Sequence, residues 1–275
     1  MSRRLGARLV VPSVLVGLIL LVAAFPGLFA GLFGHGDPRV CDLRFSRQGP
    51  TAGHPFGFDI QGCDLYANVI HGARSSVLIG LLVTLGCVVI AMVLGVVSAY
   101  YQGWVDMLIG RLMDVIFGFP ALVGMIVILS TIQRRDALVV SSVLILFGWP
   151  GATRLMRASA LSCVNLDYVR AAVSLGAGPL RVMRRHVLPN SLAPLLAVTS
   201  LNVGGVITAE SALTFLGVGL KTPAISWGVQ LNVAQDAFLN HPHLLLFPAL
   251  SLSLTVLAFV LLGDAVRDRL DPKSR

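Results

Sequence analysis

Residues with the chemistry of an active site are few in this chain of 275 residues. Glu210 is the acidic residue that lies deep within a long apolar segment, where a charge is costly unless it faces protein or water. Together with Asn202 and Thr208 it could line a path for a solute, or it could satisfy the backbone or a neighbouring helix. No GxSxG, HExxH or paired intramembrane aspartate pattern accompanies it, as an intramembrane enzyme would require. The sequence therefore predicts no catalytic residue.

Four side chains that could bind a metal lie close together in the sequence: His54, Asp59, Cys63 and Asp64. Their spacing matches no standard metal site, and they mix hard oxygen donors with a soft thiolate. We therefore expect a turn-rich structural loop without a bound metal. Cys41 lies in the same loop and could form a disulfide with Cys63 on an oxidising side of a membrane. From the residues alone, a bonded pair and a free pair both stay open.

The stretch DYVRAAVSLGAGPLRVMRRHVLPN, residues 167–190, is too polar to lie in lipid and contains four arginines, two glycines and two prolines. Asp167 is expected to cap the N-terminus of a helix over residues 168–175. Gly176 or Gly178 would end this helix, because glycine readily adopts the left-handed conformation that a helix end often requires.

A second helix is predicted over residues 180–187, with Pro179 in its first turn, where the missing N–H would be unpaired anyway. Pro189 and Pro194 are expected to begin the next long helix after a stiff corner. The second helix has an apolar stripe and a basic stripe at helical spacing. The apolar stripe is Leu180, Met183 and Val187, and the basic stripe is Arg181, Arg184 and Arg185.

The predicted elbow region is residues 154–190, and its polar part 167–190, called the elbow below, has two interpretations. It could be an amphipathic loop that faces lipid, or it could be a docking element for a soluble partner with acidic groups. The pair Ala171-Ala172 favours docking, because small residues let the backbone of another protein approach closely.

The elements that must position these residues are helices within a membrane. With 56% hydrophobic and 12% charged residues, the chain has too few polar groups to coat a water-soluble globule. About 20 residues of helix cross the hydrocarbon core of a bilayer, and six charge-free segments approach or exceed that length. They are Leu9–Gly36, Ser75–Val105, Val115–Gln133, Ala137–Thr153, His186–Ala209 and Ala237–Gly263. The predicted fold is an all-α integral membrane bundle of six transmembrane helices, with the elbow between the fourth and the fifth.

The basic residues predict how the bundle is oriented, since Lys and Arg accumulate in cytoplasmic loops. With the N-terminus inside, the inner segments hold 14 of these residues and the outer segments hold 7. Arg134 and Arg135, in the tight outer connection, go against the rule. Both termini are therefore predicted to be cytoplasmic, and the first span is expected to be retained as a helix and not cleaved as a signal peptide. The net charge of +8 suits anionic membrane lipid, and no nucleic-acid partner is expected.

We expect one integral membrane domain whose helices are joined by polar connections. Its predicted parts are residues 1–36 (N-terminus and first helix), 37–76 (the outer loop), 77–264 (the core, with an outer segment at 219–243) and 265–275 (the tail). In the outer segment, an apolar stripe recurs at helical spacing and indicates a helix at the interface or dipping into the bundle. That stripe is Trp227, Leu231, Ala234 and Phe238.

Several motifs resemble those of a known family. The elbow sequence RAAVSLGAGPLRVMRRHVLP resembles the cytoplasmic signature of permease subunits in binding-protein-dependent ABC importers, in which Glu-Ala-Ala precedes a glycine and, in the peptide-type branch, His-x-Leu-Pro. The matching positions are Ala171, Ala172, Gly176, His186, Leu188 and Pro189. Other segments resemble the same branch: HPFGFDIQGCDL, GARSSVLIGLL, YYQGWVDMLIGRLMDVIFGFP, GWPGATRLMR, ESALTFLGVGL, SWGVQL and LLGDAVRDRLDP. The resemblance covers residues 55–272 and indicates the C-type permease of a dipeptide, oligopeptide or nickel importer.

The resemblance implies a function that needs partners. These are a second homologous permease, two ATP-binding subunits or one two-domain ATPase, and an extracytoplasmic solute-binding protein, all at a prokaryotic inner membrane. The elbow would form a coupling helix seated in a groove of one ATPase. Its implied contact residues are Asp167, Tyr168, Arg170, Ala171, Ala172, Gly176, Arg181, Arg184, Arg185, His186, Leu188 and Pro189. ATP and Mg²⁺ would bind to the ATPases, because this chain has no GxxxxGK[ST] loop, and we expect it to be neither an enzyme nor a cofactor-binding subunit.

Two positions depart from the family pattern. Arg170 stands where the family has Glu, which removes the second half of a capping box with Asp167 and places a cation against the helix dipole. We expect Arg170 to pair either with Asp167 or with an acidic group on the ATPase. Cys63 stands where the family usually has Arg, and a bond to Cys41 would staple the outer loop.

The predicted cargo is a di- or oligopeptide. A nickel chelate, haem or another compact solute imported by the same architecture is the alternative. An ion-driven secondary transporter is a further alternative, but it would need more ionisable residues within the membrane than Glu210 alone.

Overall fold

Helices of very different lengths make up most of the protein. The computed structural model describes residues 2–34 and 36–270. The principal α-helices are α1 (Ser2–Ala24), α2 (Pro26–Ala30), α3 (Leu65–Tyr101), α4 (Gly103–Phe117), α5 (Ala121–Thr131), α6 (Ala137–Val164), α7 (Asp167–Ser174), α8 (Pro179–Val182), α9 (Leu188–Phe215), α10 (Trp227–Ala234) and α11 (His243–Leu270). The outer loop has short 3₁₀ and bridge structure, and residues 271–275 of the predicted tail lie outside the described residues.

The helices suit a membrane protein. Within the described parts of the chain, four helical runs are long and apolar enough to cross a membrane: Leu65–Tyr101, Ala137–Val164, Pro179–Phe215 and His243–Arg269. The pair α4 and α5 could form one more broken span, and the apolar part of α1, Leu9–Ala24, is shorter. The all-helical membrane fold is therefore confirmed, whereas the count of six spans stays a prediction.

The first predicted span, residues 9–36, is not one helix. α1 ends at Ala24 and α2 begins at Pro26, with Phe25 between them. Proline lacks the N–H of a helical hydrogen bond and disfavours the helical conformation of the residue before it. Pro26 therefore divides a segment in which hydropathy alone indicates a continuous helix.

The third predicted span, residues 115–133, is also divided. α4 ends at Phe117 and Pro120 precedes the first residue of α5. The two helices meet at a bend of 80°. The single helix predicted over residues 115–133 is therefore wrong, for the same reason as at the first span.

The longer helices extend beyond the charge-free segments that predicted them. α3 begins well before Ser75, because the Asp64 carboxyl group caps it by accepting the backbone N–H of Tyr66 at 2.9 Å. α6 continues past Thr153 as far as Val164. Charged residues mark the limits of the hydrocarbon core, but they do not by themselves end a helix.

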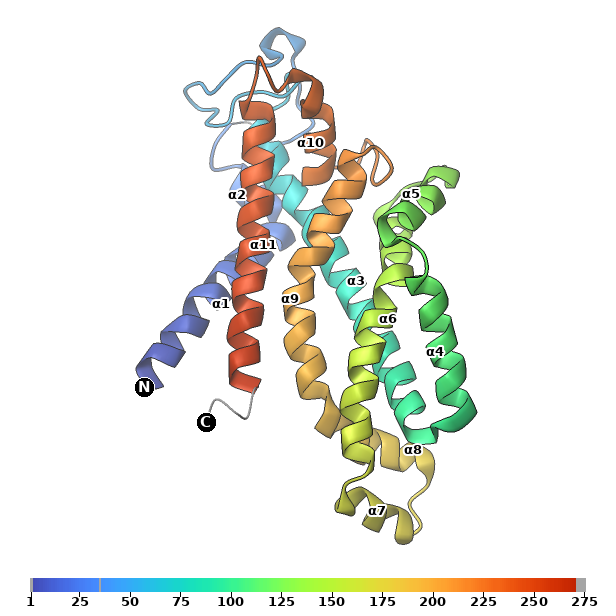
Figure 1. Ribbon diagram of the computed structural model, residues 1–275. Coiled ribbons are helices and arrows are strands. Elements are labelled where there is room, and N and C mark those ends of the chain that lie inside the picture. Colours follow the sequence, from blue (N-terminus) through green and yellow to red (C-terminus); the bar gives the residue numbers. More distant parts are fainter. Residues whose placement is uncertain (1, 35, 271–275) are drawn as a thin grey trace.

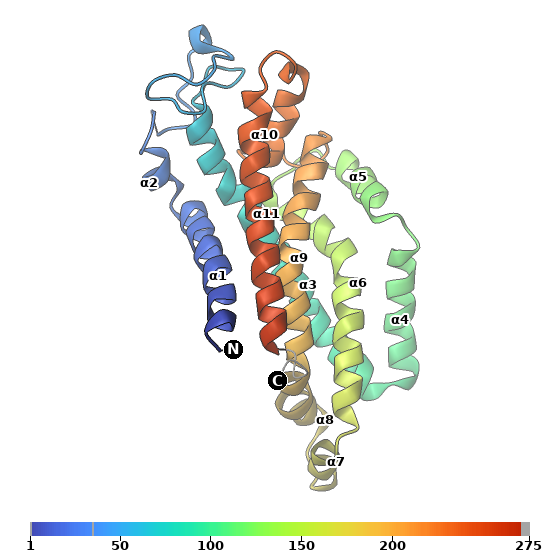
Figure 2. The same cartoon turned by 60° about the vertical axis from the view of Figure 1, so that its left-hand side comes forward.

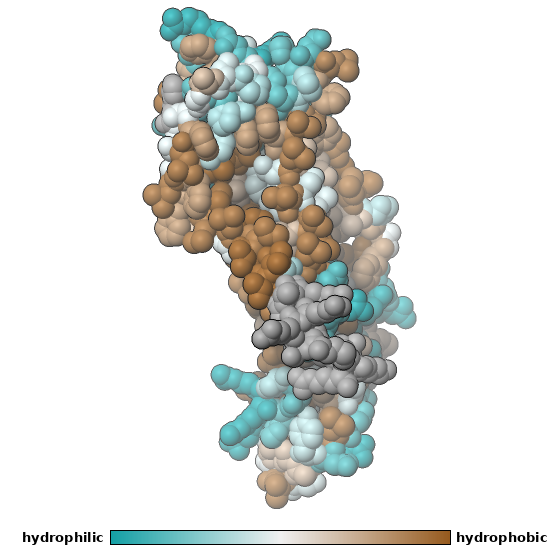
Figure 3. Space-filling view, turned by 90° about the vertical axis from the view of Figure 1, so that its left-hand side faces the viewer, coloured by the Kyte–Doolittle hydropathy of each residue, from teal (hydrophilic) through white to brown (hydrophobic). Residues whose placement is uncertain are grey.

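The long helices pack side by side, with α3 crossing behind α9 and α6 (Figures 1 and 2). α1 lies along α11 at one edge of the bundle, and the bent pair α4–α5 lies beside α6 at the opposite edge. The outer loop and α10 form one end of the molecule, and α7 and α8 form the other. In the face shown in Figure 3, hydrophilic residues gather at both ends and hydrophobic residues cover the upper middle.

Close helix contacts depend on glycine at two places. A Cβ atom on Gly263 of α11 would lie 2.6 Å from the backbone nitrogen of Leu201 in α9. A Cβ atom on Gly95 of α3 would lie 2.8 Å from the Cβ of Met156 in α6. Small residues allow helices to approach closely where hydrophobic burial cannot drive association in lipid. These two contacts hold α11 against α9 and α6 against α3.

Candidate functional site

The first helix of the elbow, α7, starts one residue earlier than predicted. Leu166 occupies the N-cap position with extended backbone, and no side chain caps the helix. Asp167 is instead the first helical residue, so the prediction that it caps the helix is wrong. Its carboxylate still lies where negative charge is favourable, in the first turn of the helix.

The end of α7 has the geometry that the glycine pattern predicted. Gly176 has a φ of +84°. The N–H of Gly176 donates to the carbonyl of Val173 at 2.9 Å, and the N–H of Ala177 donates to the carbonyl of Ala172 at 3.1 Å. This hydrogen-bond pair is a Schellman motif, which satisfies carbonyl groups that the helix end would leave unpaired. The turn of the elbow is therefore set by local sequence.

The second half of the elbow differs from the prediction. Pro179 does lie in the first turn of α8, as expected. A π-helical turn over Met183–Val187 follows, and α9 then begins at Leu188 without an interruption. A π turn accommodates the place where Pro189 has no N–H to donate. Residues 180–187 are therefore helical as predicted, and Pro189 lies in the first turn of α9 as predicted, but the two helices are not separate, because the π turn runs directly into α9.

Three buried valines anchor the elbow to the bundle. Val169 is 2% exposed, and Val182 and Val187 are fully buried. They belong to one apolar cluster with residues of α3 and α6, among them Ala99 and Ala160. The predicted apolar stripe is only partly correct, since Leu180 is 74% exposed while Val187 is buried. A movement of the elbow would thus be transmitted to α3, α6 and α9 through packed side chains.

The exposed face of the elbow is basic with an apolar tip. At this tip, between α7 and α8, Leu175 is 88% exposed. Its exposed predicted contact residues are Asp167, Tyr168, Arg170, Ala171, Gly176, Arg181, Arg184, Arg185 and Pro189, while Ala172, His186 and Leu188 are half-buried. None of the four arginines forms an ion pair with another residue that the structure describes. Exposed apolar side chains beside unpaired cations are typical of a protein-binding surface with a complementary, acidic partner.

An ion pair that the sequence analysis did not identify lies above the elbow. The Arg157 guanidinium of α6 donates two hydrogen bonds to the Asp106 carboxylate of α4, both at 2.5 Å, and Ser98 of α3 also donates to this carboxylate. Arg154 pairs with Asp114 at 3.2 Å. A signal was present, because the two arginines are three residues apart and share one face of a helix. The sequence could not show which acidic residues face these arginines, because that depends on how α4 packs against α6.

A cavity of about 250 Å³ lies among α3, α5, α6 and α9. Its polar lining is sparse and consists of Thr84, Thr199 and Asn202. Thr208 is exposed on another face of α9, and Glu210 is buried away from the cavity. The structure therefore does not bring together the three residues predicted as a polar group of the path.

The carboxyl group of Glu210 is held by hydroxyl groups. Thr214 donates to one oxygen at 2.9 Å, Ser211 donates to the other at 3.2 Å, and Ser76 of α3 forms a further hydrogen bond. Ser76 in turn accepts the backbone N–H of Trp227 at the start of α10. Glu210 thus belongs to a network that joins α3, α9 and α10.

In the outer segment, α10 dips into the bundle. Trp227 is 3% exposed and its indole N–H donates to the carbonyl of Val69 at 2.9 Å. Leu231 and Ala234 are also buried, whereas Phe238 lies beyond the helix and is exposed. This stripe was predicted either to lie at the membrane interface or to dip into the bundle, and the structure has the second arrangement.

The polar residues of the outer loop are engaged in holding the loop together. Cys41 and Cys63 form a disulfide, Asp64 contacts His54 at 2.9 Å, and one oxygen of Asp59 accepts the backbone N–H groups of Gln61 and Cys63, both at 2.8 Å. Burial raises the pKa of Asp59, although these backbone donors act in the opposite direction. Among the described residues, no group of three or more side chains could hold a metal ion.

Comparisons with known proteins agree on one family. Residues 91–275 match the model of the family described as binding-protein-dependent transport system inner membrane component. The chain is 35% identical to the glutathione transport system permease protein GsiD of Pectobacterium atrosepticum, over 98% of this chain and 89% of that protein. It is 33% identical to the dipeptide transport system permease protein DppC of Alkalihalophilus pseudofirmus, over 95% and 86% of the two chains.

A solved structure has a similar fold. The crystal structure of an amino acid ABC transporter with histidines superposes with a TM-score of 0.56 at 15% identity, over 74% of this chain and 94% of that one. At this level of identity the match concerns the fold alone. The extent of the family match and the identity to the permease relatives decide the assignment: this chain belongs to the family of binding-protein-dependent transport system inner membrane components.

Proposed function

We propose that this chain is the permease subunit of an ABC importer for di- or oligopeptides in a prokaryotic inner membrane. The relatives named as glutathione and dipeptide permeases support this cargo class. The observation that carries the coupling role is the elbow, whose unpaired arginines and exposed leucines require a partner surface. The chain itself is not an enzyme, and hydrolysis of ATP with Mg²⁺ belongs to the partner ATPases.

The complete transporter would contain a second homologous permease, two ATP-binding subunits or one two-domain ATPase, and an extracytoplasmic binding protein. We place the elbow on the cytoplasmic side with both termini and propose six membrane crossings, with α1 and the bent pair α4–α5 contributing one crossing each. The 14-to-7 distribution of basic residues supports this orientation. The beginning of α1 and the end of α11 both point toward the elbow end of the bundle (Figure 1), which agrees with termini on one side.

The elbow would act as a rigid lever. Closure of the ATPases would move α7, and the buried Val169, Val182 and Val187 would pass the movement to α3, α6 and α9. The cavity lined by Asn202 lies among α3, α6 and α9 together with α5, so a change in their packing would open or close it. Arg170 has no partner among the described residues, and we propose that it pairs with an acidic group of the ATPase.

A substitution on the exposed side of α7 tests this coupling. Ala171→Trp adds bulk where a partner backbone would approach, and we expect peptide-stimulated ATPase activity of the purified complex to fall at least about tenfold, since a 1.4 kcal/mol loss of contact has that effect. Ala52→Trp, in the exposed outer loop, is the matched control and should keep wild-type activity.

Wild-type stimulation in Ala171→Trp would contradict the docking role, as would purification of the chain as a homo-oligomer without any ATPase. The same assay tests Arg170→Glu: unchanged or higher stimulation would exclude a favourable ion pair between Arg170 and the ATPase. Stimulation only by nickel chelates or haem would replace the peptide cargo and leave the coupling role in place.

A further inference from the structure

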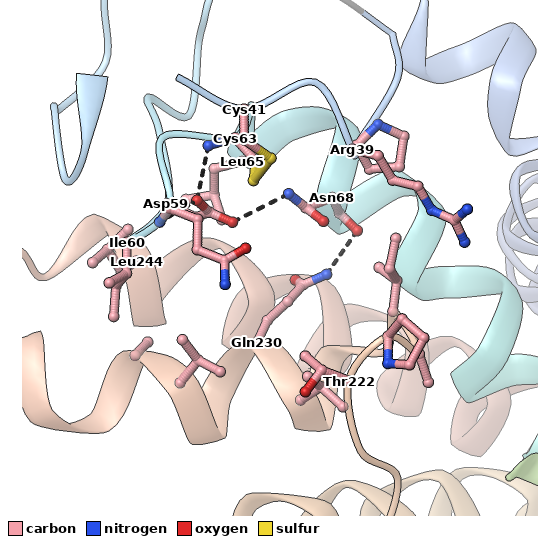
Figure 4. Close-up of a pocket in the computed structure, with 18 residues that line it drawn as sticks. Arg39, Cys41, Asp59, Ile60, Cys63, Leu65, Asn68, Thr222, Gln230 and Leu244 are labelled. Carbon is pink, nitrogen blue, oxygen red and sulfur yellow. Dashed lines mark hydrogen bonds between the residues drawn. A yellow bond between two sulfur atoms is a disulfide. The ribbon is translucent and has the colours of Figure 1, made fainter. Parts of the chain in front are cut away.

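A second cavity, of about 360 Å³, lies at the end of the molecule opposite the elbow. Its walls come from the outer loop, the start of α3, the segment before α10, α10 itself and the start of α11 (Figure 4). Its size falls within the range of small-molecule sites, roughly 300–1,000 Å³. Apolar residues form most of the lining, including Leu65, Val229, Val233 and Leu244. The Cys41–Cys63 disulfide also lines it, so part of the wall is covalently fixed.

Two hydrogen-bond acceptors in this lining are not fully used. Backbone N–H groups bind the Asp59 carboxylate, two of them at one oxygen. The side-chain contact of its other oxygen is the Asn68 amide, at the long distance of 3.4 Å. Gln230 donates to the carbonyl of Asn68 at 2.7 Å, which leaves its own Oε1 buried without a donor. A buried acceptor without a partner costs free energy, so a bound donor would be stabilised here.

Opposite charges lie at the two ends of the cavity. Figure 4 shows Asp59 on one side and Arg39 on the other, with Asn68 and Gln230 between them. The Arg39 side chain is exposed and forms no ion pair with any other described residue. The burial that raises the pKa of Asp59 makes its negative charge costly. A cation placed next to it would offset that cost.

We propose that this cavity is a binding site for short peptides with free termini, in which Asp59 and Gln230 receive the ammonium group and Arg39 receives the carboxylate. The apolar walls would contact side chains without selecting among them. The inference rests on the proposed peptide cargo and adds a site that recognises peptide ends on the permease itself. This site would hold a peptide at the outer end of the bundle before it enters the membrane.

Binding of trialanine to the purified transporter complex in lipid nanodiscs, without the solute-binding protein, tests the site. The three probes are trialanine, N-acetyl-trialanine, which lacks the ammonium group, and trialanine amide, which lacks the carboxylate. We expect each blocked peptide to bind about tenfold or more weakly, as the loss of a charge-assisted hydrogen bond predicts. Asp59→Asn should abolish the discrimination against the acetylated peptide, and Arg39→Gln should abolish the discrimination against the amide.

Two matched controls lie on the same side of the molecule but outside the cavity. Arg44→Gln and Asp236→Asn remove an exposed cation and an exposed acid, and both should discriminate among the three probes as the wild type does. Arg39 is exposed and unpaired, so Arg39→Gln keeps the test valid even if Asp59→Asn fails to fold.

The outcomes separate this site from the proposed function. In one outcome, peptides together with the binding protein stimulate the ATPase, but trialanine does not bind saturably to the complex alone. This result would overturn the proposed site and leave the proposed peptide cargo in place. Discrimination that persists in both cavity variants also overturns the site. Trialanine binding with the expected end preferences, in a complex whose ATPase ignores peptides, would support the site and overturn the cargo.

Discussion

The position of Glu210 within a long apolar helix does not by itself decide the role of its carboxyl group. A charged group within an apolar helix indicates either a solute path or an internal polar network. The structure surrounds it with hydroxyl groups from its own helix and from α3, and it is fully buried. The geometry therefore favours a role in joining helices over a role in contacting solute.

Replacing Glu210 distinguishes these roles. Glu210→Gln keeps one acceptor oxygen, whereas Glu210→Leu leaves the hydroxyls of Ser76, Ser211 and Thr214 without their acceptor, at about 1–3 kcal/mol for a buried unsatisfied group. We expect the leucine variant to be less stable by at least this amount, measured by thermal unfolding in detergent, and the glutamine variant to transport. Thr208→Val, which removes an exposed hydroxyl, should have little effect. A stable glutamine variant without transport would indicate a path role.

At the scale of elements, the bent pair α4–α5 is attached to the bundle differently from the other helices. Only Ile109 and Met113 of the described residues in α4 are buried. Polar contacts to α6 supplement this small apolar contact, through the pairs Asp106–Arg157 and Asp114–Arg154. Arg154 also lies 4.6 Å from the centre of the Phe117 ring. Because α6 continues into the elbow, these pairs link the edge of the bundle to the proposed coupling surface.

Loss of the Asp106–Arg157 ion pair, which is the less exposed of the two, should weaken the attachment of α4 to α6. For Arg157→Gln we expect a destabilisation of about 1–2 kcal/mol, between the values for exposed and buried pairs, and faster amide hydrogen exchange in α4. Arg154→Gln is the matched control, because its pair is more than half exposed and should contribute about 1 kcal/mol or less. Equal exchange rates in α4 for Arg157→Gln and the wild type would show that the apolar contacts alone hold this helix.

For the whole molecule, the proposed orientation rests on the distribution of basic residues along the chain. The exception to the positive-inside pattern has a structural explanation, because both arginines of the connection between α5 and α6 are locally paired. Arg134 pairs with Asp136 at 3.1 Å, and Arg135 donates to the carbonyl of Gly217 at 3.0 Å. Basic groups bound in this way are compatible with a position at the outer end.

Cysteine labelling tests this orientation. In a background without Cys87 and Cys163, both buried, a membrane-impermeant maleimide should label Ala52→Cys in intact cells or spheroplasts. Ser174→Cys, exposed at the elbow, should react only after the membrane is opened. The reverse pattern would invert the proposed topology, and labelling of both sites in intact cells would place the elbow outside the cytoplasm.

The sequence by itself determined what depends on nearest neighbours along the chain. Apolar segments indicated membrane helices, Gly176 and Pro179 set the turn of the elbow, and the motifs indicated the family that the comparisons confirm. These features depend on contacts within a few residues, so local chemistry is sufficient to specify them. The breaks at Pro26 and Pro120 also depend on local sequence. The hydropathy of the residues around them is that of a continuous helix, so hydropathy alone did not predict these breaks.

Only the tertiary structure decided which residues meet across the bundle. It paired Asp106 with Arg157 and buried Val182 in place of Leu180. It also separated Glu210 from Asn202 and built the outer cavity from Asp59 and Gln230. Such contacts join residues far apart in the chain, and they depend on how helices of similar composition pack against each other. No local pattern specifies that packing, because every helix of the bundle offers apolar faces that fit several neighbours.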